Sequence, residues 1–216
     1  MTIGVFDSGI GGEAIAASLR IFFPNARVIS VHDAAHMPYG SRTSADITAL
    51  TDAAIQPLLS LACDVVVIAC NTATTHALAT LRATYPHQHF VGIEPMIKPA
   101  AALTHTNVIT VCATPATLAS ERYHQLKQEF GRGLTILEPD CSNWAHMIEN
   151  NRINKNVIRE QITDSLHQGS DVIVLGCTHY HWIKDLVERY ADGKAIVLEP
   201  SLAIARQVER LLTKDG

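Results

Sequence analysis

The sequence predicts an α/β fold of two pseudosymmetric lobes with mainly parallel sheets. Residues 63–72 align without a gap to residues 170–179, and each copy is a β-branched run that reaches a cysteine. Strand-like and helix-like segments alternate along the chain, which is typical of parallel sheets with right-handed crossovers. The length of 216 residues suits two lobes of about 100 residues each. We therefore expect one lobe from residues 1–94 plus 200–216 and another from 95–199, with an active site in the interlobe cleft.

The expected strands are short runs rich in β-branched residues, the pattern of a parallel strand buried on both faces. In the first lobe they lie near residues 3–6, 27–31, 64–69 and 89–93. In the second lobe they lie near residues 107–112, 134–137, 171–176 and 195–198. The repeated cysteine runs supply the third strand of each lobe.

The expected helices follow these strands in turn. They lie near residues 13–22, 44–62, 73–84, 96–104, 116–130, 154–168, 179–190 and 201–213. The repeat continues beyond the cysteines, because residues 91–95 resemble residues 197–200 and each segment leads into an alanine-rich helix. The end of the first strand, residues 5–8, corresponds by the same offset to residues 110–114. The last helix is therefore expected to pack back on the first lobe.

The charge balance excludes several classes of partner. There are 17 Lys and Arg residues against 21 Asp and Glu, a formal charge of −4, and no basic run interleaves with aromatic residues. We expect neither nucleic acid nor a membrane as partner. The amino terminus has no basic region before its apolar run, which stops at Asp7, so it resembles a strand and not a signal peptide. A cytoplasmic protein is expected.

The cysteines number five and form no CxxC pair, which argues against a disulfide scaffold or a zinc ribbon. Free thiols are expected instead, with Cys63 and Cys112 as packed residues. Histidines such as His32 and His36 lack a clear further ligand, so no metal site is expected. Trp144 and Trp182 are expected to be packing or cleft-edge residues.

Two cysteines carry the chemical argument. A single cysteine after an apolar run is most often an inert core residue. Cys70 and Cys177, however, end equivalent strands, and ligands bind at the carboxyl ends of strands in open α/β sheets. A helix that begins after each thiol would lower its pKa and favour a bound carboxylate. Two thiols that approach a carbon from opposite faces could invert it by proton transfer.

Four short motifs occur in order and span almost the whole chain. They are Phe-Asp-Ser-Gly-Ile-Gly-Gly at 6–12, Pro-Tyr-Gly at 38–40, Ala-Cys-Asn-Thr at 69–72 and Gly-Cys-Thr-His-Tyr at 176–180. Together they resemble the signature set of the cofactor-independent glutamate racemases of the aspartate/glutamate racemase superfamily. The nucleotide-binding alternative is weak, since the glycine-rich segment lacks both GxGxxG and a P-loop lysine.

The resemblance implies a two-thiol racemase that needs no pyridoxal phosphate or other cofactor. Cys70 and Cys177 would be the two bases. Asp7 would assist the first, and His179 with Glu149 would assist the second. Assistance is needed because a thiol of ordinary pKa is only a few per cent ionised at neutral pH.

The physical roles of these assisting groups differ. An imidazolium at His179 would stabilise a thiolate directly, whereas a carboxylate at Asp7 would destabilise one and would instead accept a proton or hold the substrate ammonium. Asp7 could also be a turn residue at the glycine-rich bend. Glu149 could also be a solvated residue at a helix end. Residues 142–148 depart from the family pattern, which has a proline beside the cysteine and a more apolar stretch.

The substrate-binding residues implied by the resemblance offer hydroxyl, amide and backbone N–H groups to carboxylates. They are Ser8, Pro38, Tyr39, Gly40, Asn71, Thr72, Thr114, Thr117 and Thr178.

The function expected from these observations is the interconversion of L-glutamate and D-glutamate, which implies D-glutamate supply for peptidoglycan. The expected partner is a small acidic amino acid, and a homodimer is left open. One alternative is a racemase of aspartate or of a broader set of amino acids. Another is a non-catalytic paralogue that binds an acidic ligand. Decarboxylases and maleate isomerases of the superfamily fit less well, because both cysteines are present here.

Overall fold

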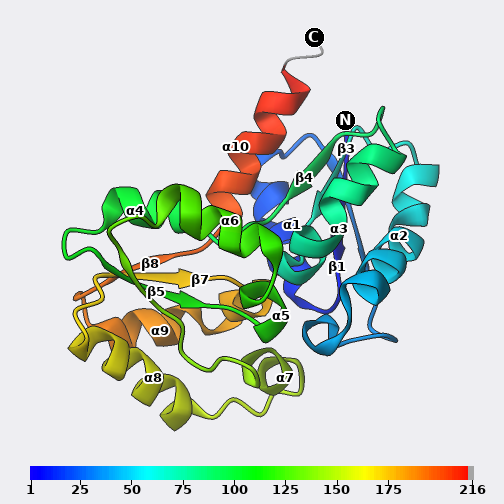
Figure 1. Ribbon diagram of the computed structural model, residues 1–216. Helices are drawn as coiled ribbons and strands as arrows, with labels where there is room; N and C mark the ends of the chain where they lie inside the picture. Colours follow the sequence, from blue (N-terminus) through cyan, green and yellow to red (C-terminus); the bar gives the residue numbers. More distant parts are fainter. Residues whose placement is uncertain (214–216) are drawn as a thin grey trace. The chain divides into compact units, whose positions relative to one another are not determined.

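The computed structural model describes residues 1–213, which divide between two compact units (Figure 1). Unit 1 contains Met1–Glu94 and the segment from Pro200 onward, and unit 2 contains Pro95–Glu199. Residues 214–216 of the first expected lobe lie outside the described residues. Each unit is built around one four-stranded, fully parallel sheet. The expected α/β class with parallel sheets is confirmed.

The sheet of unit 1 has the strand order β2-β1-β3-β4. Its strands in that order are Arg27–His32, Thr2–Asp7, Val65–Ile68 and Phe90–Gly92. The central strand β3 is buried along its whole length, as its uninterrupted β-branched sequence predicts. The carboxyl ends of β1 and β3 are hydrogen-bonded neighbours, with Phe6 opposite Ile68.

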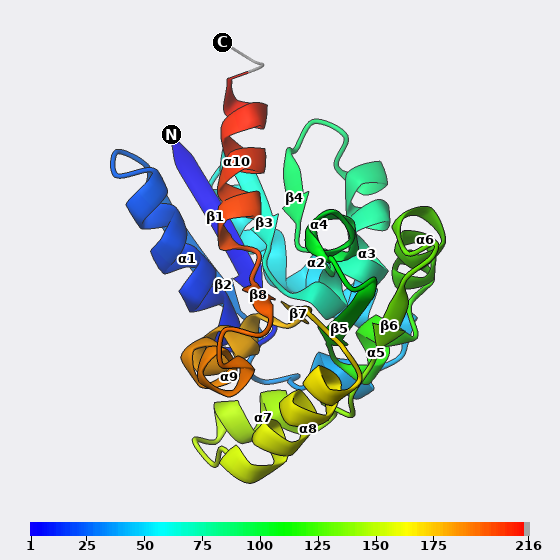
Figure 2. The same cartoon turned by 90° about the vertical axis from the view of Figure 1, so that its left-hand side faces the viewer.

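Two pairs of helices cover the faces of this sheet. One pair is α1 and α10, which span Gly11–Phe22 and Ser201–Leu212 and lie side by side (Figure 2). The other pair is α2 and α3, which span Ser44–Ser60 and Asn71–Thr84. Alternate residues of β3 face the two pairs: Val65 and Val67 pack with α1 and α10, whereas Val66 and Ile68 pack with α2 and α3. A single 3₁₀ turn, η1, spans Tyr39–Ser41.

The sheet of unit 2 repeats this order as β6-β5-β7-β8. Its strands in that order are Thr135–Leu137, Val108–Cys112, Val172–Leu175 and Ile196–Leu198. The helices α4 and α6 pack on one face and α8 and α9 on the other. They span Ile97–Leu103, Glu121–Phe130, Lys155–His167 and Lys184–Ala191. Three short elements complete the unit: α5 (Pro115–Leu118), α7 (Trp144–Glu149) and the 3₁₀ segment η2 (Thr178–Ile183).

The pairing registers measure the repeat directly. Val65 and Val172 differ by 107 positions, and they pair with Ile3 and Ile109, which differ by only 106. The expectation that the first strands share the cysteine offset was therefore wrong by one residue. At the observed offset of 106, Asp7 is matched by Ala113 and Ser8 by Thr114, and Ser8 and Thr114 are the residues at which the two expected segments end.

Four helical details differ from the expected elements. The helix expected at 116–130 is interrupted, because the Ser120 hydroxyl accepts a hydrogen bond from the Tyr123 N–H and starts a new helix. The helix expected at 179–190 begins as the 3₁₀ segment η2. The short elements η1 and α7 were not expected, since one or two turns leave little periodic signal in a sequence.

Among residues 1–213, no helix combines the length and apolar character needed to cross a bilayer. In the same part of the chain, no three His, Cys, Asp or Glu side chains are grouped so that they could hold a metal ion. All five cysteines are free and buried, and the packing expected of Cys63 and Cys112 is confirmed.

Candidate active site

In unit 1, Cys70 lies at the turn from β3 into α3. Its backbone is extended, and its sulfur caps the helix by accepting a hydrogen bond from the Ala73 N–H at 3.4 Å. The thiol is 6% exposed. The sequence produces this geometry because the apolar run of β3 ends at a residue that can cap a helix, and Asn71 then opens α3.

Ser8 and Asp7 follow the neighbouring strand β1. The Ser8 hydroxyl oxygen lies 3.4 Å from the Cys70 sulfur. Asp7 is buried, and its Oδ1 accepts a hydrogen bond from the Gly9 N–H at 2.8 Å, so it does stabilise the glycine-rich turn. A Cβ atom at Gly12 would lie 2.4 Å from the Asp7 Cβ. Glycine at this position therefore allows the first turn of α1 to lie directly beside Asp7.

The electrostatic environment of Cys70 favours the neutral thiol. Burial raises the pKa of Cys70 to about 11, and the Asp7 carboxylate adds to that increase. Hydrogen bonds from Ser8 and Ala73 act in the opposite direction by stabilising the thiolate. Without a ligand, the Cys70 sulfur is therefore almost entirely protonated at neutral pH.

Asn71 and Tyr39 present different kinds of polar group in the same unit. The amide oxygen and nitrogen of Asn71 are both buried, and neither has a hydrogen-bond partner among the described residues. Such groups cost free energy unless a ligand or water satisfies them. The Tyr39 hydroxyl instead donates to Asp33 Oδ2 at 2.8 Å, and burial together with that carboxylate raises the tyrosine pKa. Sequence reasoning missed Asp33, for which a carboxylate six residues before Tyr39 was the one signal.

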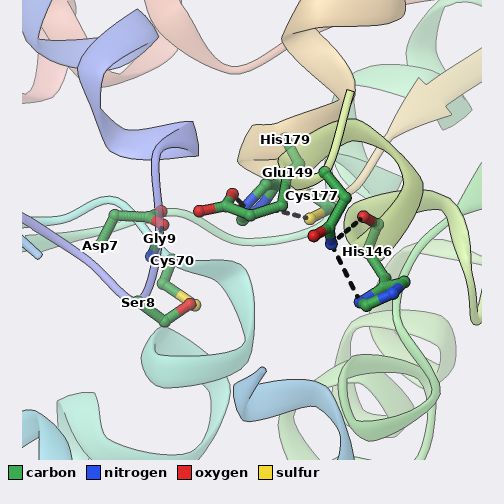
Figure 3. A network of polar contacts seen from close by, with 9 residues as sticks. Asp7, Ser8, Gly9, Cys70, His146, Glu149, Cys177 and His179 are labelled. Atoms are coloured by element: carbon green, nitrogen blue, oxygen red, sulfur yellow. Dashed lines mark hydrogen bonds and ion pairs between the residues drawn. The ribbon is translucent and has the colours of Figure 1, made fainter. Parts of the chain in front are cut away.

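In unit 2, Cys177 lies two residues after the strand β7 and is joined to a histidine and a glutamate (Figure 3). The Cys177 sulfur lies 3.6 Å from His179 Nδ1, and His179 Nε2 lies 2.6 Å from Glu149 Oε2. The histidine and glutamate side chains are only 6% and 13% exposed. Glu149 is therefore not a solvated helix-end residue, although it is the last residue of α7.

The hydrogen-bond donors among Cys177, His179 and Glu149 follow from the chemistry of the three groups. An ionised carboxylate can only accept, so His179 Nε2 donates to Glu149. His179 Nδ1 then faces the sulfur, where it accepts from a thiol when the ring is neutral and donates to a thiolate when the ring is charged. The geometry thus allows a hydrogen bond between the ring and the sulfur with the ring either neutral or charged.

The backbone approaches Cys177 closely at Gly176. Its N–H donates to the Cys112 carbonyl at 2.7 Å, and a Cβ at this glycine would lie 2.9 Å from the same oxygen. The equivalent residue in unit 1 is Ala69, whose N–H donates to the Phe6 carbonyl at 2.6 Å. At Gly176 a side chain would meet the Cys112 carbonyl and the Ala113 Cβ, so the local geometry favours glycine before the second cysteine.

The threonines of unit 2 are buried near the start of short helices. Thr114 Oγ1 accepts from the Thr117 N–H at 3.3 Å and donates to the Thr117 hydroxyl at 3.0 Å. Thr178 is the first residue of η2 and is 3% exposed.

The expected site residues thus gather in two groups, one in each unit. Unit 1 brings Cys70 into contact with Ser8 and near Asp7, and it also holds Thr72 in the first turn of α3 and the turn of Pro38, Tyr39 and Gly40. In unit 2, His179 lies in hydrogen-bond contact with both Cys177 and Glu149. The same unit contains Thr114, Thr117 and Thr178.

Comparison with known proteins gives consistent matches over almost the whole chain. The family model described as Asp/Glu/Hydantoin racemase matches residues 13–208. The glutamate racemase of Herpetosiphon aurantiacus is 37% identical over 214 residues, covering 97% of this chain and 84% of the relative. That of Roseiflexus sp. strain RS-1 is 35% identical over 218 residues, covering 99% and 80%. The crystal structure of Escherichia coli glutamate racemase with L-glutamate and the activator UDP-MurNAc-ala is similar with a TM-score of 0.90 and 27% identity, covering 98% and 82%.

Proposed function

The chain belongs to the Asp/Glu/Hydantoin racemase family, and we propose that it interconverts L-glutamate and D-glutamate by proton transfer between the α-carbon and two thiols. The observation that carries this proposal is the equivalence of Cys70 and Cys177. Each thiol lies two residues after the equivalent strand of a sheet with the same strand order, and the two are 107 positions apart in the sequence. The names of the relatives favour glutamate as the substrate.

The proposed reaction needs one thiolate and one thiol at a time. The thiolate removes the α-proton, and the thiol delivers a proton to the opposite face of the same carbon. The net proton count does not change, and the two sulfurs exchange protonation states. The reverse direction uses them in opposite roles. The mechanism therefore requires both cysteines to reach one α-carbon when the substrate is bound.

On the Cys177 side, we assign the charge control to His179 and Glu149. The Glu149 carboxylate accepts the Nε2–H, and a charged ring would donate its Nδ1–H toward the Cys177 sulfur. A positively charged donor beside a sulfur favours the thiolate. When Cys177 takes the α-proton it becomes a neutral thiol, and the charged ring then keeps both of its own protons.

On the Cys70 side, we assign Asp7 to the substrate ammonium. In the free protein the Asp7 carboxylate raises the Cys70 pKa. An ammonium bound beside it would cancel much of that charge, and the hydrogen bonds from Ser8 and Ala73 would then favour the thiolate. The Cys70 thiol would thus ionise more readily when the substrate is bound than in the free protein.

The substrate carboxylates are assigned to neutral donors. The buried amide of Asn71 lacks a partner among the described residues, so a ligand that hydrogen-bonds to it removes an existing penalty. The hydroxyl groups of Ser8, Thr72 and Thr178 are further candidate donors close in sequence to the two thiols. We propose that these groups select an acidic amino acid.

The physiological role follows from the same resemblance. We propose that the D-glutamate supplies peptidoglycan synthesis in the cytoplasm. The remaining expectations from the sequence, a homodimer and activity without a cofactor, stay predictions. Racemisation of aspartate or of several amino acids, and non-catalytic binding of an acidic ligand, are the alternatives to be tested.

The test is racemisation followed by circular dichroism in both directions, together with deuterium incorporation at the α-carbon in D₂O. The enzyme should be chelated exhaustively and assayed without pyridoxal phosphate. We expect glutamate to exchange faster than aspartate, and aspartate faster than alanine, because unpaired carboxylate donors cost more than one misplaced methylene. Faster exchange of aspartate would favour the other substrate. Binding of glutamate without any exchange would favour the non-catalytic alternative.

A further inference from the structure

The helix α7 carries Glu149 but is too short to hold itself in place. It spans only six residues, Trp144–Glu149, with Glu149 at its last position. Isolated helices of this length are unstable in water, so contacts with the rest of the unit must determine where the Glu149 carboxylate lies. The 2.6 Å bond from His179 Nε2 to Glu149 therefore depends on what anchors α7.

One side chain of α8 anchors the start of α7. Trp144 Nε1 donates to Gln161 Oε1 at 2.8 Å, and Gln161 Nε2 donates to the carbonyl of Asp140. A single amide thus bonds both the first residue of α7 and the loop that precedes it. We call this arrangement of Trp144, Gln161 and Asp140 the α7 brace.

The α7 brace also contacts the segment of chain that carries His179. The buried Trp144 ring packs edge-on against Tyr180, with 5.1 Å between ring centroids. The Tyr180 hydroxyl donates to the Cys141 carbonyl at 3.1 Å, and Tyr180 directly follows His179 in the chain. Trp144 therefore contacts Tyr180, which directly follows His179, and lies on the same helix as Glu149.

We infer that Trp144 and Gln161 are positioning residues that hold Glu149 against His179 and so control the protonation of Cys177. The inference rests on the proposed function, because it assigns a purpose to the His179–Glu149 contact in proton transfer. The side-chain hydrogen bonds of Trp144 and Gln161 go to each other and to the carbonyl of Asp140, so we assign them an effect through α7. A misplacement of about 1 Å in an active group can lower a rate by roughly 100-fold, so a loosened brace should be visible in turnover.

The test compares Gln161→Leu and Trp144→Phe with a matched control. Gln161→Leu removes both hydrogen bonds at similar size, and Trp144→Phe removes the indole donor while an aromatic ring remains. The control is Gln56→Leu in unit 1, where Gln56 Nε2 bonds the Tyr85 hydroxyl and the Asp52 carbonyl, each at 2.9 Å. It removes a similar helix-borne bridge to an aromatic side chain and a backbone oxygen.

We expect kcat for glutamate to fall by about 10- to 100-fold in the folded Gln161→Leu variant, less in Trp144→Phe, and under about twofold in Gln56→Leu, with smaller changes in KM. In a Glu149→Ala background, where no acceptor for the His179 Nε2–H remains on this side chain, adding Gln161→Leu should lower kcat by no more than about twofold, because the contact it serves is already lost. An undiminished effect in that background, or full kcat in both brace variants, would overturn the inference.

A readout without catalysis separates this inference from the proposed function. The His179 Nε2–H should give a ring proton resonance that exchanges slowly with solvent in the parent and in Gln56→Leu, and rapidly in Gln161→Leu and Trp144→Phe. If the parent does not racemise glutamate, the proposed function fails while this measurement still decides the role of the brace. Equal exchange protection in parent and brace variants would refute it. If Gln161→Leu does not fold, Trp144→Phe provides the same comparison.

Discussion

The two cysteine sites share a position in the fold but differ in everything that sets their protonation. Cys70 caps an α-helix and contacts a serine beside a buried carboxylate. Cys177 precedes a 3₁₀ segment, caps nothing with its side chain and contacts a histidine that is bonded to a glutamate. The repeated scaffold therefore determines where each sulfur lies, and residues that differ between the two units determine the electrostatic surroundings of each one.

The asymmetry can be followed residue by residue. In the register of the sheets, Asp7 is matched by Ala113, and His179 is matched by Thr72 at the 107-residue offset. Glu149 lies on α7, between β6 and α8, where unit 1 has only the turn η1 between β2 and α2. Each thiol thus lies near an ionisable group that the other copy lacks, and variants of these groups test whether each acts only on its own side.

The largest effect is expected from removing either sulfur. Cys70→Ala and Cys177→Ala should each lower racemisation by about 1,000-fold or more, because each takes away one acid–base group of the pair. The fold should survive, since the substitution removes little volume. Circular dichroism in the far ultraviolet checks the fold, and polarimetric assays from both enantiomers measure turnover. Full activity in either folded variant would contradict the two-thiol mechanism.

Asp7→Asn should separate charge from catalysis on the unit 1 side. Removing the carboxylate charge should lower the Cys70 pKa from about 11, while racemisation falls by about 100-fold because the ammonium loses its partner. The thiolate absorbance of Cys70 near 240 nm, obtained as a difference from the Cys70→Ala background, follows the titration. Glu149→Gln is the control and should leave the Cys70 titration in place. An unchanged Cys70 pKa in Asp7→Asn would show that the Asp7 carboxylate does not raise it.

Stability at alkaline pH should report the burial of Cys70. Its pKa is about 11 in the folded protein against an ordinary value of 9.0, so the unfolded chain loses this proton first as the pH rises. The stability due to the buried neutral thiol is complete below pH 9.0 and is lost as the pH rises through about 11. Over that window the parent should lose stability on the order of 3 kcal/mol more than Cys70→Ala. Urea denaturation at successive pH values measures both, and identical pH profiles would count against the raised pKa.

The smallest effect is expected from exchanging the residues before the two cysteines. Gly176→Ala should destabilise unit 2 by about 1–3 kcal/mol, because the new Cβ would meet the Cys112 carbonyl at 2.9 Å. Ala69→Gly at the equivalent place should cost less, about 1 kcal/mol or below. Thermal unfolding of both variants provides the comparison. Equal tolerance at the two positions would show that the strands approach each other similarly in both units.

The sequence predicted the parts of the molecule whose signal is local. Continuous β-branched runs identified β3 and β7, and the cysteine after each run marked the equivalent strand ends. The family assignment from four motifs is confirmed by the comparisons. The one-residue difference in the β1 and β5 offset was not visible, because a hydrophobic strand pattern does not show which residues pair across the sheet.

The parts that sequence reasoning missed depend on tertiary contacts. The helix α7 has only six residues, and its anchors Gln161 and Tyr180 lie 17 and 36 positions beyond Trp144. No local pattern links these residues. Trp144 was expected as a packing or cleft-edge residue, and its burial confirms the packing, but its indole hydrogen bond could not be predicted.

The central claim is that one thiol serves each enantiomer, and exchange by the single-cysteine variants tests it most directly. In D₂O, a variant with one sulfur can remove the α-proton of the enantiomer it faces and return deuterium to the same face. We expect Cys70→Ala and Cys177→Ala to label opposite enantiomers of glutamate, each without forming the other enantiomer, as mass spectrometry after chiral separation would show. Labelling of the same enantiomer by both variants, or racemisation by either, would contradict the account.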